Sequence, residues 1–341
     1  MGETVLLAAP ASATIGLGHV ARLSALGSGL RAQGARTLFV TNSREERVHA
    51  FIQQEGAELS PASSLAPSSL VEAAGACGAT RIAIDSYTVT AAELRQLRES
   101  GLDVLFVDDA GLPPSAEASL VVNPNFFGAD VGYLLRDGAR LLAGPSYALL
   151  RPEFAKARDA TAPPHEGPVR VLVTLGGADP LGLLPRFIDA LAASGERLTA
   201  DILVGAADPK IDLARESAKK LPGSTVTVAA ADMANRILRA DAVISAAGST
   251  CLEIACIGRP ALVVPVADNQ VPVADFLERG GLMSVVSTRG SVPELVLAIR
   301  SLLGGLSSVE SCARISSQRC LVDGGGASRV AAIWLGLGLS R

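Results

Sequence analysis

The sequence predicts a two-lobed α/β protein in which each lobe has a parallel β-sheet covered by helices on both faces. Three observations predict this class. Short apolar runs alternate with longer stretches of helical period, these runs contain almost no polar residues, and a proline-rich polar stretch interrupts the series once. The length of 341 residues agrees, since it corresponds to about two domains of roughly 150 residues each.

The first series of apolar runs predicts an N-terminal lobe over residues 1–155. Strands are expected at residues 5–9, 37–40, 82–84, 104–107 and 120–122. Helical periodicity is clearest at residues 19–33 and 91–100. Because such continuous apolar strands are typical of sheets buried on both faces, we expect the sheet to be parallel.

A polar stretch with three prolines, residues 156–168, is expected to be a linker. The second lobe is then expected to cover residues 169–341. Its strands are expected at residues 169–174, 200–204, 225–228, 242–245, 261–264 and 284–286. The tail from Ser307 onward has a helical pattern, with a last segment around Trp334. Two successive βαβ series joined by a hinge follow from this pattern.

The composition excludes several classes of protein. Hydrophobic residues make up 49% and charged residues 19% of the chain, which excludes an intrinsically disordered protein. The net charge of −4 and the absence of a Lys/Arg cluster argue against duplex nucleic acid as a partner. Aromatic residues are only 4%, so platforms for base stacking are not expected either.

The longest stretch without a charged side chain, residues 4–21, raises the question of a membrane segment. Pro10, Gly18 and His19 interrupt it, so we expect neither a spanning helix nor a membrane partner. The start, Met1-Gly2-Glu3, lacks the basic region of a signal peptide, and we expect a cytoplasmic protein.

The five cysteines are an odd number without C-x-x-C spacing. They are expected to be small buried side chains rather than disulfide partners or zinc ligands.

A glycine pair, Gly16 and Gly18, follows the first predicted strand and precedes His19. Ala21 replaces the third glycine of a dinucleotide fingerprint and no acidic residue ends the second strand, which excludes a nicotinamide site. The remaining interpretation is a loop that places a histidine at a helix N-terminus, where the helix dipole favours a neutral imidazole that acts as a base. A capping histidine without catalytic function is the alternative.

The second lobe has a glycine loop after its first strand and a Gly-Ser-Thr loop further along. In the first, Gly176 and Gly177 allow close backbone approach and Asp179 is placed to cap a helix. In the second, the residues 248–250 offer backbone N–H groups and two hydroxyls to a phosphate, and Glu253 lies one turn later, where a ribose would fall. The alternatives are an ordinary capped turn for the first loop and, for the second, a capping box with Ser249 or Thr250 as the cap and Glu253 at its third position. No Lys follows as in a Walker loop.

Seven short motifs occur in order along nearly the whole chain. They are G-x-G-H-x-x-R at 16–22, Asp85-x-Tyr87, Asp108-Asp109, the G-P-x-Y-x-L-L-R-P-x-F run at 144–154, G-G-x-D-P at 176–180, A-G-S-T-x-x-E at 247–253 and Asp268-Asn269-Gln270. In this combination the chain resembles the UDP-sugar hydrolases of pseudaminic acid biosynthesis. These are relatives of the MurG-type glycosyltransferases.

The resemblance implies a GT-B fold, with two Rossmann-like domains that face each other across a cleft and a nucleotide held by the second. It implies that Gly177 and the residues Gly248, Ser249 and Thr250 cradle the diphosphate, that Glu253 bonds the ribose, and that Asn269 and Gln270 lie near the sugar or β-phosphate. Gly18 is also expected to be one of the nucleotide-binding residues, because a glycine allows the backbone to approach a ligand closely. His19 and Tyr87 match the active-site histidine and tyrosine of the family.

The implied reaction releases UDP and a free amino or deoxy sugar, with no cofactor and no metal. A helix N-terminus stabilises the leaving diphosphate, His19 activates a water, and the anomeric centre is inverted. Asp85 or Tyr87 orients the sugar. Asp108 and Asp109 are expected to cap rather than to bind a metal.

Several matters stay open. Arg22, one turn after His19, could reach substrate or pair with a carboxylate, and the structural role is expected. The uncharged stretch 9–14 departs from the family pattern, which leaves the identity of the sugar open. Transfer to a soluble acceptor and a non-catalytic binding module remain as alternatives, and the oligomeric state is open.

Overall fold

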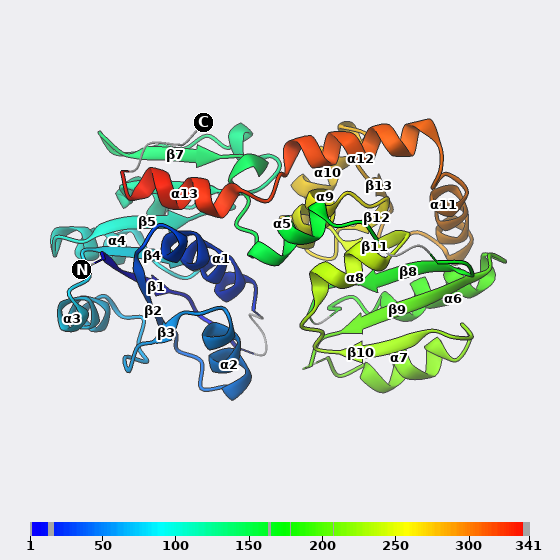
Figure 1. Cartoon of the computed structure of the whole chain (residues 1–341), viewed down its shortest axis with the longest axis horizontal. Coiled ribbons are helices and arrows are strands. Elements are labelled where there is room, and N and C mark those ends of the chain that lie inside the picture. The colour runs from blue at the N-terminus through cyan, green and yellow to red at the C-terminus, as the bar shows by residue number, and fades with distance from the viewer. Residues whose placement is uncertain (1, 13–16, 163–164, 178, 207, 337–341) are drawn as a thin grey trace. The chain divides into compact units, whose positions relative to one another are not determined.

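The computed structural model describes residues 2–12, 17–162, 165–177, 179–206 and 208–336 (Figure 1). The chain divides into two compact units. The first unit comprises Met1–Pro152 together with Gly324–Arg341, and the second comprises Glu153–Asp323.

The first unit contains a seven-stranded sheet in which every neighbouring pair is parallel. Its strands are β1 (Thr4–Ala8), β2 (Arg36–Val40), β3 (Glu58–Leu59), β4 (Arg81–Asp85), β5 (Asp103–Val107), β6 (Leu120–Asn123) and β7 (Arg140–Ala143). The order is β3-β2-β1-β4-β5-β6-β7. All five predicted strands are present, and the short strands β3 and β7 are additional.

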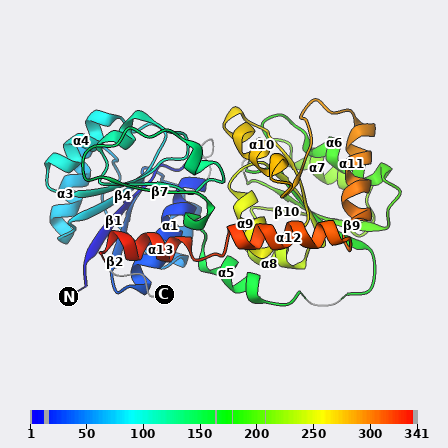
Figure 2. The same cartoon turned by 90° about the horizontal axis from the view of Figure 1, so that it is seen from above.

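Helices cover both faces of this sheet (Figure 2). They are α1 (Gly18–Ala32), α2 (Glu46–Gln54), α3 (Pro67–Cys77), α4 (Ala91–Glu99) and α13 (Gly326–Trp334). Buried residues of α1, α2 and α13 form one apolar cluster, and those of α3 and α4 form another on the opposite face. Successive strand residues alternate between the two clusters, because successive side chains of a strand point to opposite faces of the sheet. Both faces are apolar, as is typical of parallel sheets.

The C-terminal helix α13 belongs to the first unit, so the expectation that residues 324–341 belong to the second lobe is wrong. Helix α13 packs on α1 so closely that a Cβ added at Gly29 would lie 2.7 Å from the carbonyl oxygen of Ala327. The indole of Trp334 also donates a hydrogen bond to Asp103 Oδ2 at 3.1 Å. Helical periodicity marks an apolar face but does not say which sheet that face covers.

The second unit contains a six-stranded parallel sheet of order β10-β9-β8-β11-β12-β13. Its strands are β8 (Val169–Thr174), β9 (Leu198–Val204), β10 (Thr225–Val228), β11 (Ala242–Ala246), β12 (Ala261–Val264) and β13 (Ser284–Val285). All six predicted strands are therefore confirmed.

The first helix of the second unit extends into the expected linker. The helices of this unit are α5 (Pro152–Asp159), α6 (Leu184–Ala193), α7 (Ile211–Ala218), α8 (Met233–Arg239), α9 (Thr250–Ile257), α10 (Val271–Arg279), α11 (Val292–Gly304) and α12 (Val309–Leu321). The expected linker 156–168 is wrong in its first part, because α5 runs to Asp159. Arg158 fixes this helix by donating to the backbone carbonyls of Cys256 and Val322.

Two of the cysteines differ from the expectation. Cys251 and Cys256 are buried, as predicted, and Cys77 is half-buried, but Cys312 and Cys320 are exposed on α12. In the part of the chain that the structure describes, no single helix is long and apolar enough to cross a membrane. One pair bent by 88°, Val292–Gly304 with Val309–Trp334, meets the same test of length and composition.

In both sheets the first strand lies in the interior of the sheet. The next two strands are added on one side of it, and the later strands are added on the other side. Such sheets bind ligands beyond the carboxyl ends of the two strands where the order reverses. These strands are β1 and β4 in the first unit, and β8 and β11 in the second. The residues that follow these four strands are therefore the candidate ligand-binding residues of each unit.

Candidate functional site

His19 lies at this edge of the first unit. It is the second residue of α1, and its side chain is buried. Its Nδ1 lies 2.5 Å from Oδ1 of Asp85, the last residue of β4. Asp85 is only 1% exposed, so the contact is shielded from water. The structure thus brings together two of the predicted catalytic residues.

Arg22, one turn after His19 on α1, holds the other side of Asp85. Its Nε donates to Asp85 Oδ2 at 2.7 Å and its Nη2 to Asp85 Oδ1 at 2.8 Å. Burial alone would raise the pKa of Asp85, but the charge of Arg22 and the hydrogen bond from His19 hold this pKa below its ordinary value. Asp85 is therefore an ionised carboxylate at neutral pH.

The charge of Asp85 determines the tautomer of His19. An ionised carboxylate accepts hydrogen bonds and donates none, so Nδ1 carries the proton in the contact with Asp85. In this tautomer Nδ1 cannot accept from Arg22 Nη2, which lies 3.1 Å away, so that approach is a contact and not a hydrogen bond. Among the described residues none is hydrogen-bonded to Nε2. The lone pair of the neutral ring is then on Nε2, which is the nitrogen able to take a proton. A carboxylate that fixes a histidine in this way also stabilises the imidazolium that forms.

Tyr87 lies next to His19, with ring centroids 4.8 Å apart and an edge-to-face angle of 76°. Its side chain is 47% exposed, and its hydroxyl donates to Asp109 Oδ2 at 2.8 Å. Partial burial and the charge of Asp109 raise the pKa of Tyr87 to about 12. At neutral pH Tyr87 is therefore a phenol that is a hydrogen-bond donor.

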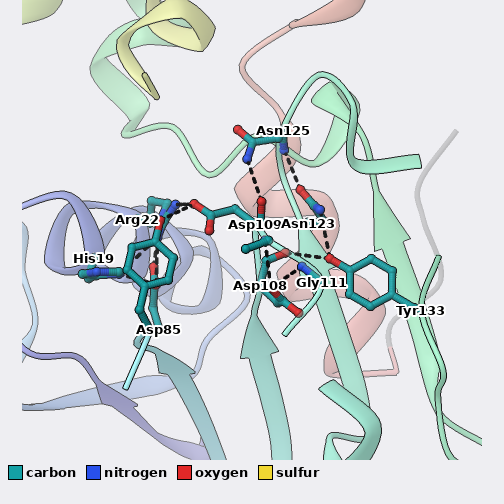
Figure 3. Close-up of polar contacts among 11 residues, drawn as sticks. His19, Arg22, Asp85, Asp108, Asp109, Gly111, Asn123, Asn125 and Tyr133 are labelled. Atoms are coloured by element: carbon teal, nitrogen blue, oxygen red, sulfur yellow. Dashed lines mark hydrogen bonds and ion pairs between the residues drawn. The ribbon is translucent and has the colours of Figure 1, made fainter. Parts of the chain in front are cut away.

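Asp108 and Asp109 follow β5 and have different partners (Figure 3). The Asp108 carboxylate accepts from the N–H groups of Ala110 and Gly111, as expected of a capping residue. Asp109 instead accepts from Arg22 Nη1 at 2.6 Å and from Tyr87, so the expectation of a cap is wrong for Asp109.

Arg22 and Asp109 belong to the same cluster as His19. The pairing of Arg22 with a carboxylate agrees with the structural role expected of it, whereas the contacts of Asp109 with Arg22 and Tyr87 were not predicted. The charges of Asp85 and Asp109 outweigh the effect of burial and raise the pKa of Arg22 well above its ordinary value. One signal for Asp109 was present in the sequence, since Asp85 and Asp109 follow predicted strands that are consecutive along the chain.

In the second unit the predicted glycine loops lie at the carboxyl edge, after β8 and β11. A Cβ added at Gly205, after β9, would collide with the carbonyl of Gly177, so these two loops touch through backbone. A Cβ added at Gly177 itself would meet nothing within 4 Å. Gly177 therefore leaves open space for a ligand on the side away from Gly205.

The loop after β11 leads directly into α9. Ser249 is exposed at the N-cap position, and no side-chain hydrogen bond caps the helix. The alternative of a Ser249 or Thr250 capping box with Glu253 is therefore wrong. With its hydroxyls not used for capping, this N-terminus has the groups that an anion needs.

The loop after β12 lies beside the same helix start. Gln270 accepts a hydrogen bond from Val266 N at 3.0 Å through Oε1, which orients its amide NH₂. This nitrogen lies 3.6 Å from where a Cβ on Gly248 would be. Asn269 is exposed in the same loop, and Glu253 is half-buried one turn into α9. Gln270, after β12, thus lies beside Gly248, after β11.

The remaining predicted residues occupy different places. Asp179 accepts from the N–H groups of Leu183 and Leu184, both at 2.9 Å, and so caps α6, which begins four residues later than Pro180. Gly18 is exposed beside His19 in the first unit rather than with the loops of the second. Gly16 lies outside the described residues. No group of three or more His, Cys, Asp or Glu side chains suited to a metal ion occurs among the residues described.

No model of a known protein family matches the chain. It is 26% identical to the spore coat polysaccharide biosynthesis protein SpsG of Bacillus subtilis (strain 168), over 93% of this chain and 94% of SpsG. Among solved structures it is similar to MurG of Acinetobacter baumannii, with a TM-score of 0.68, 17% identity and coverage of 98% of this chain and 100% of MurG. It is also similar to CalG4, the calicheamicin glycosyltransferase, with a TM-score of 0.65, 16% identity and coverage of 99% and 100%. Because these likenesses extend over nearly the full length of each chain, the protein has the GT-B fold, with two Rossmann-like parallel-sheet units.

Proposed function

We propose that this protein is a nucleotide-sugar hydrolase that releases UDP and a free amino or deoxy sugar. The observation that carries the proposal is the contact between His19 and the buried carboxylate of Asp85, which leaves Nε2 of the ring as a base. A neutral histidine fixed by a carboxylate is suited to take a proton from a nucleophilic hydroxyl.

The second unit would hold the nucleotide. Gly177 and the N-terminus of α9, at Gly248, Ser249 and Thr250, would bind the diphosphate through backbone N–H groups and hydroxyls. Glu253 would accept hydrogen bonds from the ribose, and Asn269 and Gln270 would contact the β-phosphate or the sugar. Charge that develops on the diphosphate as it leaves is stabilised by the same helix terminus.

The first unit would supply the base. A water attacks the anomeric carbon while His19 Nε2 takes its proton, and the bond from that carbon to the diphosphate oxygen breaks. The electron pair of that bond leaves with UDP, and the ionised Asp85 stabilises the imidazolium. Attack opposite to the leaving group inverts the anomeric centre. Tyr87, a protonated phenol, orients the sugar by donating a hydrogen bond.

The comparisons support the class of pathway. SpsG is named for the biosynthesis of a spore coat polysaccharide. A protein that cleaves a nucleotide sugar would supply the free sugar from which the next building block of a glycan is made.

Transfer of the sugar to an acceptor is the second candidate, and the likeness to CalG4, which is named as a glycosyltransferase, favours it. In that reaction His19 would deprotonate an acceptor hydroxyl in place of water. The groups that bind the diphosphate would be the same.

The test is to incubate the protein with a panel of UDP-sugars in the absence of any acceptor. Hydrolysis predicts UDP and free sugar in equal amounts, with the product first appearing as the inverted anomer in proton NMR spectra. UDP release that depends strictly on an added alcohol or amine would favour transfer instead. Binding of UDP-sugars without turnover under either condition would contradict both reactions.

A further inference from the structure

Asp109 contacts both Arg22 and Tyr87, the two residues that lie against His19 together with Asp85. Its Oδ2 accepts from Arg22 Nη1 at 2.6 Å and from the Tyr87 hydroxyl at 2.8 Å (Figure 3). Arg22 comes from α1 and Tyr87 from the loop after β4, and only 10% of the Asp109 side chain is exposed. One carboxylate oxygen therefore holds two of the three groups that face the imidazole.

The backbone around Asp109 is tied from several directions. The Asp108 carboxylate accepts hydrogen bonds from the N–H groups of Ala110, Gly111 and Leu112 and from the hydroxyl of Ser115. Tyr133 donates its hydroxyl to the Asp108 carbonyl at 2.9 Å, and Asn125 donates to the Asp109 carbonyl at 3.4 Å (Figure 3). A loop held in this way places the Asp109 side chain before any substrate binds.

The charges of the cluster also depend on Asp109. The groups that face His19 are Asp85 from β4, Arg22 from α1 and the neutral phenol of Tyr87, and Asp109 from the loop after β5 contacts the last two. Two carboxylates and one guanidinium give a net charge of −1 when the imidazole is neutral, and of zero once it takes a proton. Without the charge of Asp109, Arg22 would be balanced by Asp85 alone, with its Nη2 only 3.1 Å from His19 Nδ1.

We propose that Asp109 is a positioning residue for the reaction: it holds the ring of Tyr87 against His19 and balances the charge of Arg22, so that His19 can take a proton. The inference rests on the proposed function, since it concerns His19 acting as a base.

The first test observes His19 directly and requires no turnover. The chain has three histidines, so ring signals of the full ¹⁵N-labelled protein can be followed by NMR as the pH is changed. In Asp109→Asn the titration midpoint of His19 is expected to be lower than in the wild-type protein, because removal of a negative charge from the cluster disfavours the protonated ring. Asp137→Asn is the matched control, since Asp137 is exposed in the same unit. His49 and His165 should be unchanged in both variants.

Tyr87→Phe removes the hydrogen bond from the Tyr87 hydroxyl to Asp109 without changing any charge. The ring-current shift of Tyr87 on the His19 protons is expected to change, because the phenyl ring loses its anchor, while the His19 titration midpoint stays in place. If Asp109→Asn does not fold, this variant still tests whether Asp109 holds the ring of Tyr87 against His19.

The kinetic readout follows. In Asp109→Asn, kcat for UDP release is expected to fall about 10-fold to 100-fold, with the affinity for UDP unchanged. The acidic limb of the pH profile of kcat/KM should move to lower pH in step with the His19 midpoint. A purely structural role would lower the melting temperature and leave this limb where it is.

A His19 midpoint that is the same in folded Asp109→Asn and Asp137→Asn would overturn the charge-balancing role. Unaltered His19 proton shifts in Tyr87→Phe would overturn the positioning of Tyr87. If the wild-type protein turned over no nucleotide sugar while the midpoint still moved in Asp109→Asn, the proposed function would be wrong and the coupling of Asp109 to His19 would stand.

Discussion

The Nδ1 of His19 lies 2.5 Å from Oδ1 of Asp85, and this contact joins residues that are 66 positions apart in the chain. It forms where β1 and β4 end, because these two strands are neighbours in the sheet and each is followed by a loop at the same edge.

Asp85→Asn is expected to lower kcat for UDP release by about 10²-fold to 10⁴-fold, because an amide neither fixes the Nδ1–H tautomer nor stabilises the imidazolium. The affinity for UDP should stay within about twofold, since UDP contacts are assigned to the second unit. Steady-state rates and calorimetric binding of UDP measure the two effects. Equal losses of rate and affinity would show that the variant disturbs the protein as a whole.

Asp85 should also stabilise the first unit in a pH-dependent way. Its pKa in the folded protein is below the ordinary value of about 3.9, so its contribution is present above about pH 4 and is lost as the pH falls through the folded value. Asp85→Asn is expected to lower the free energy of unfolding by about 3 kcal/mol at pH 7, because it leaves Arg22 partly unpaired and buried.

At pH 3 the difference between wild type and Asp85→Asn should be smaller than at pH 7. Urea unfolding followed by the fluorescence of Trp334, the single tryptophan of the chain and a residue of the first unit, measures both values. An equal difference at the two pH values would contradict a lowered pKa.

Glu253→Gln is expected to weaken UDP binding about 10-fold, because an amide replaces a charged acceptor for the ribose hydroxyls. Inorganic pyrophosphate has no ribose, so its affinity should not change. Glu278→Gln, at an exposed position of the same unit, is the matched control. Equal weakening of UDP and pyrophosphate would argue that Glu253 acts on the diphosphate or on the fold of α9.

Gly29→Ala tests the placement of the C-terminal helix. The added Cβ would lie 2.7 Å from the carbonyl oxygen of Ala327 on α13, and backbone atoms there have little freedom to move. A loss of about 1–3 kcal/mol in the free energy of unfolding of the first unit is expected. Gly75→Ala is the control, since a Cβ there meets nothing within 4 Å and alanine favours the helix, by up to about 1 kcal/mol. Destabilisation of the same size in both variants would contradict close packing of α1 on α13.

The sequence was sufficient for most of the fold where apolar runs are buried on both faces, as in β11 and β12 of the second unit. It missed β3 because this strand has only two residues, and β7 because this strand begins with two exposed residues and so has no continuous apolar run. It also misassigned α13, because packing partners distant in the chain leave no mark on the periodicity of a helix.

The candidate site was predictable in part for a related reason. Asp85 and Tyr87 stand at the end of β4 or just after it, and His19 stands at the start of the helix that follows β1, where parallel sheets gather functional residues. The choice of partners depends on side-chain geometry, and nothing in the spacing of Asp108 and Asp109 says which of them turns toward Arg22. For the same reason the uncapped start of α9 was visible only in the structure.

The central claim is that His19 activates the nucleophile that displaces UDP. The most direct measurement compares His19→Gln with the wild-type protein for UDP release from a UDP-sugar and for calorimetric UDP affinity. The account predicts a rate lower by about 10²-fold to 10⁴-fold with UDP affinity within about twofold of wild type. A His19→Gln protein that releases UDP at the wild-type rate would contradict it.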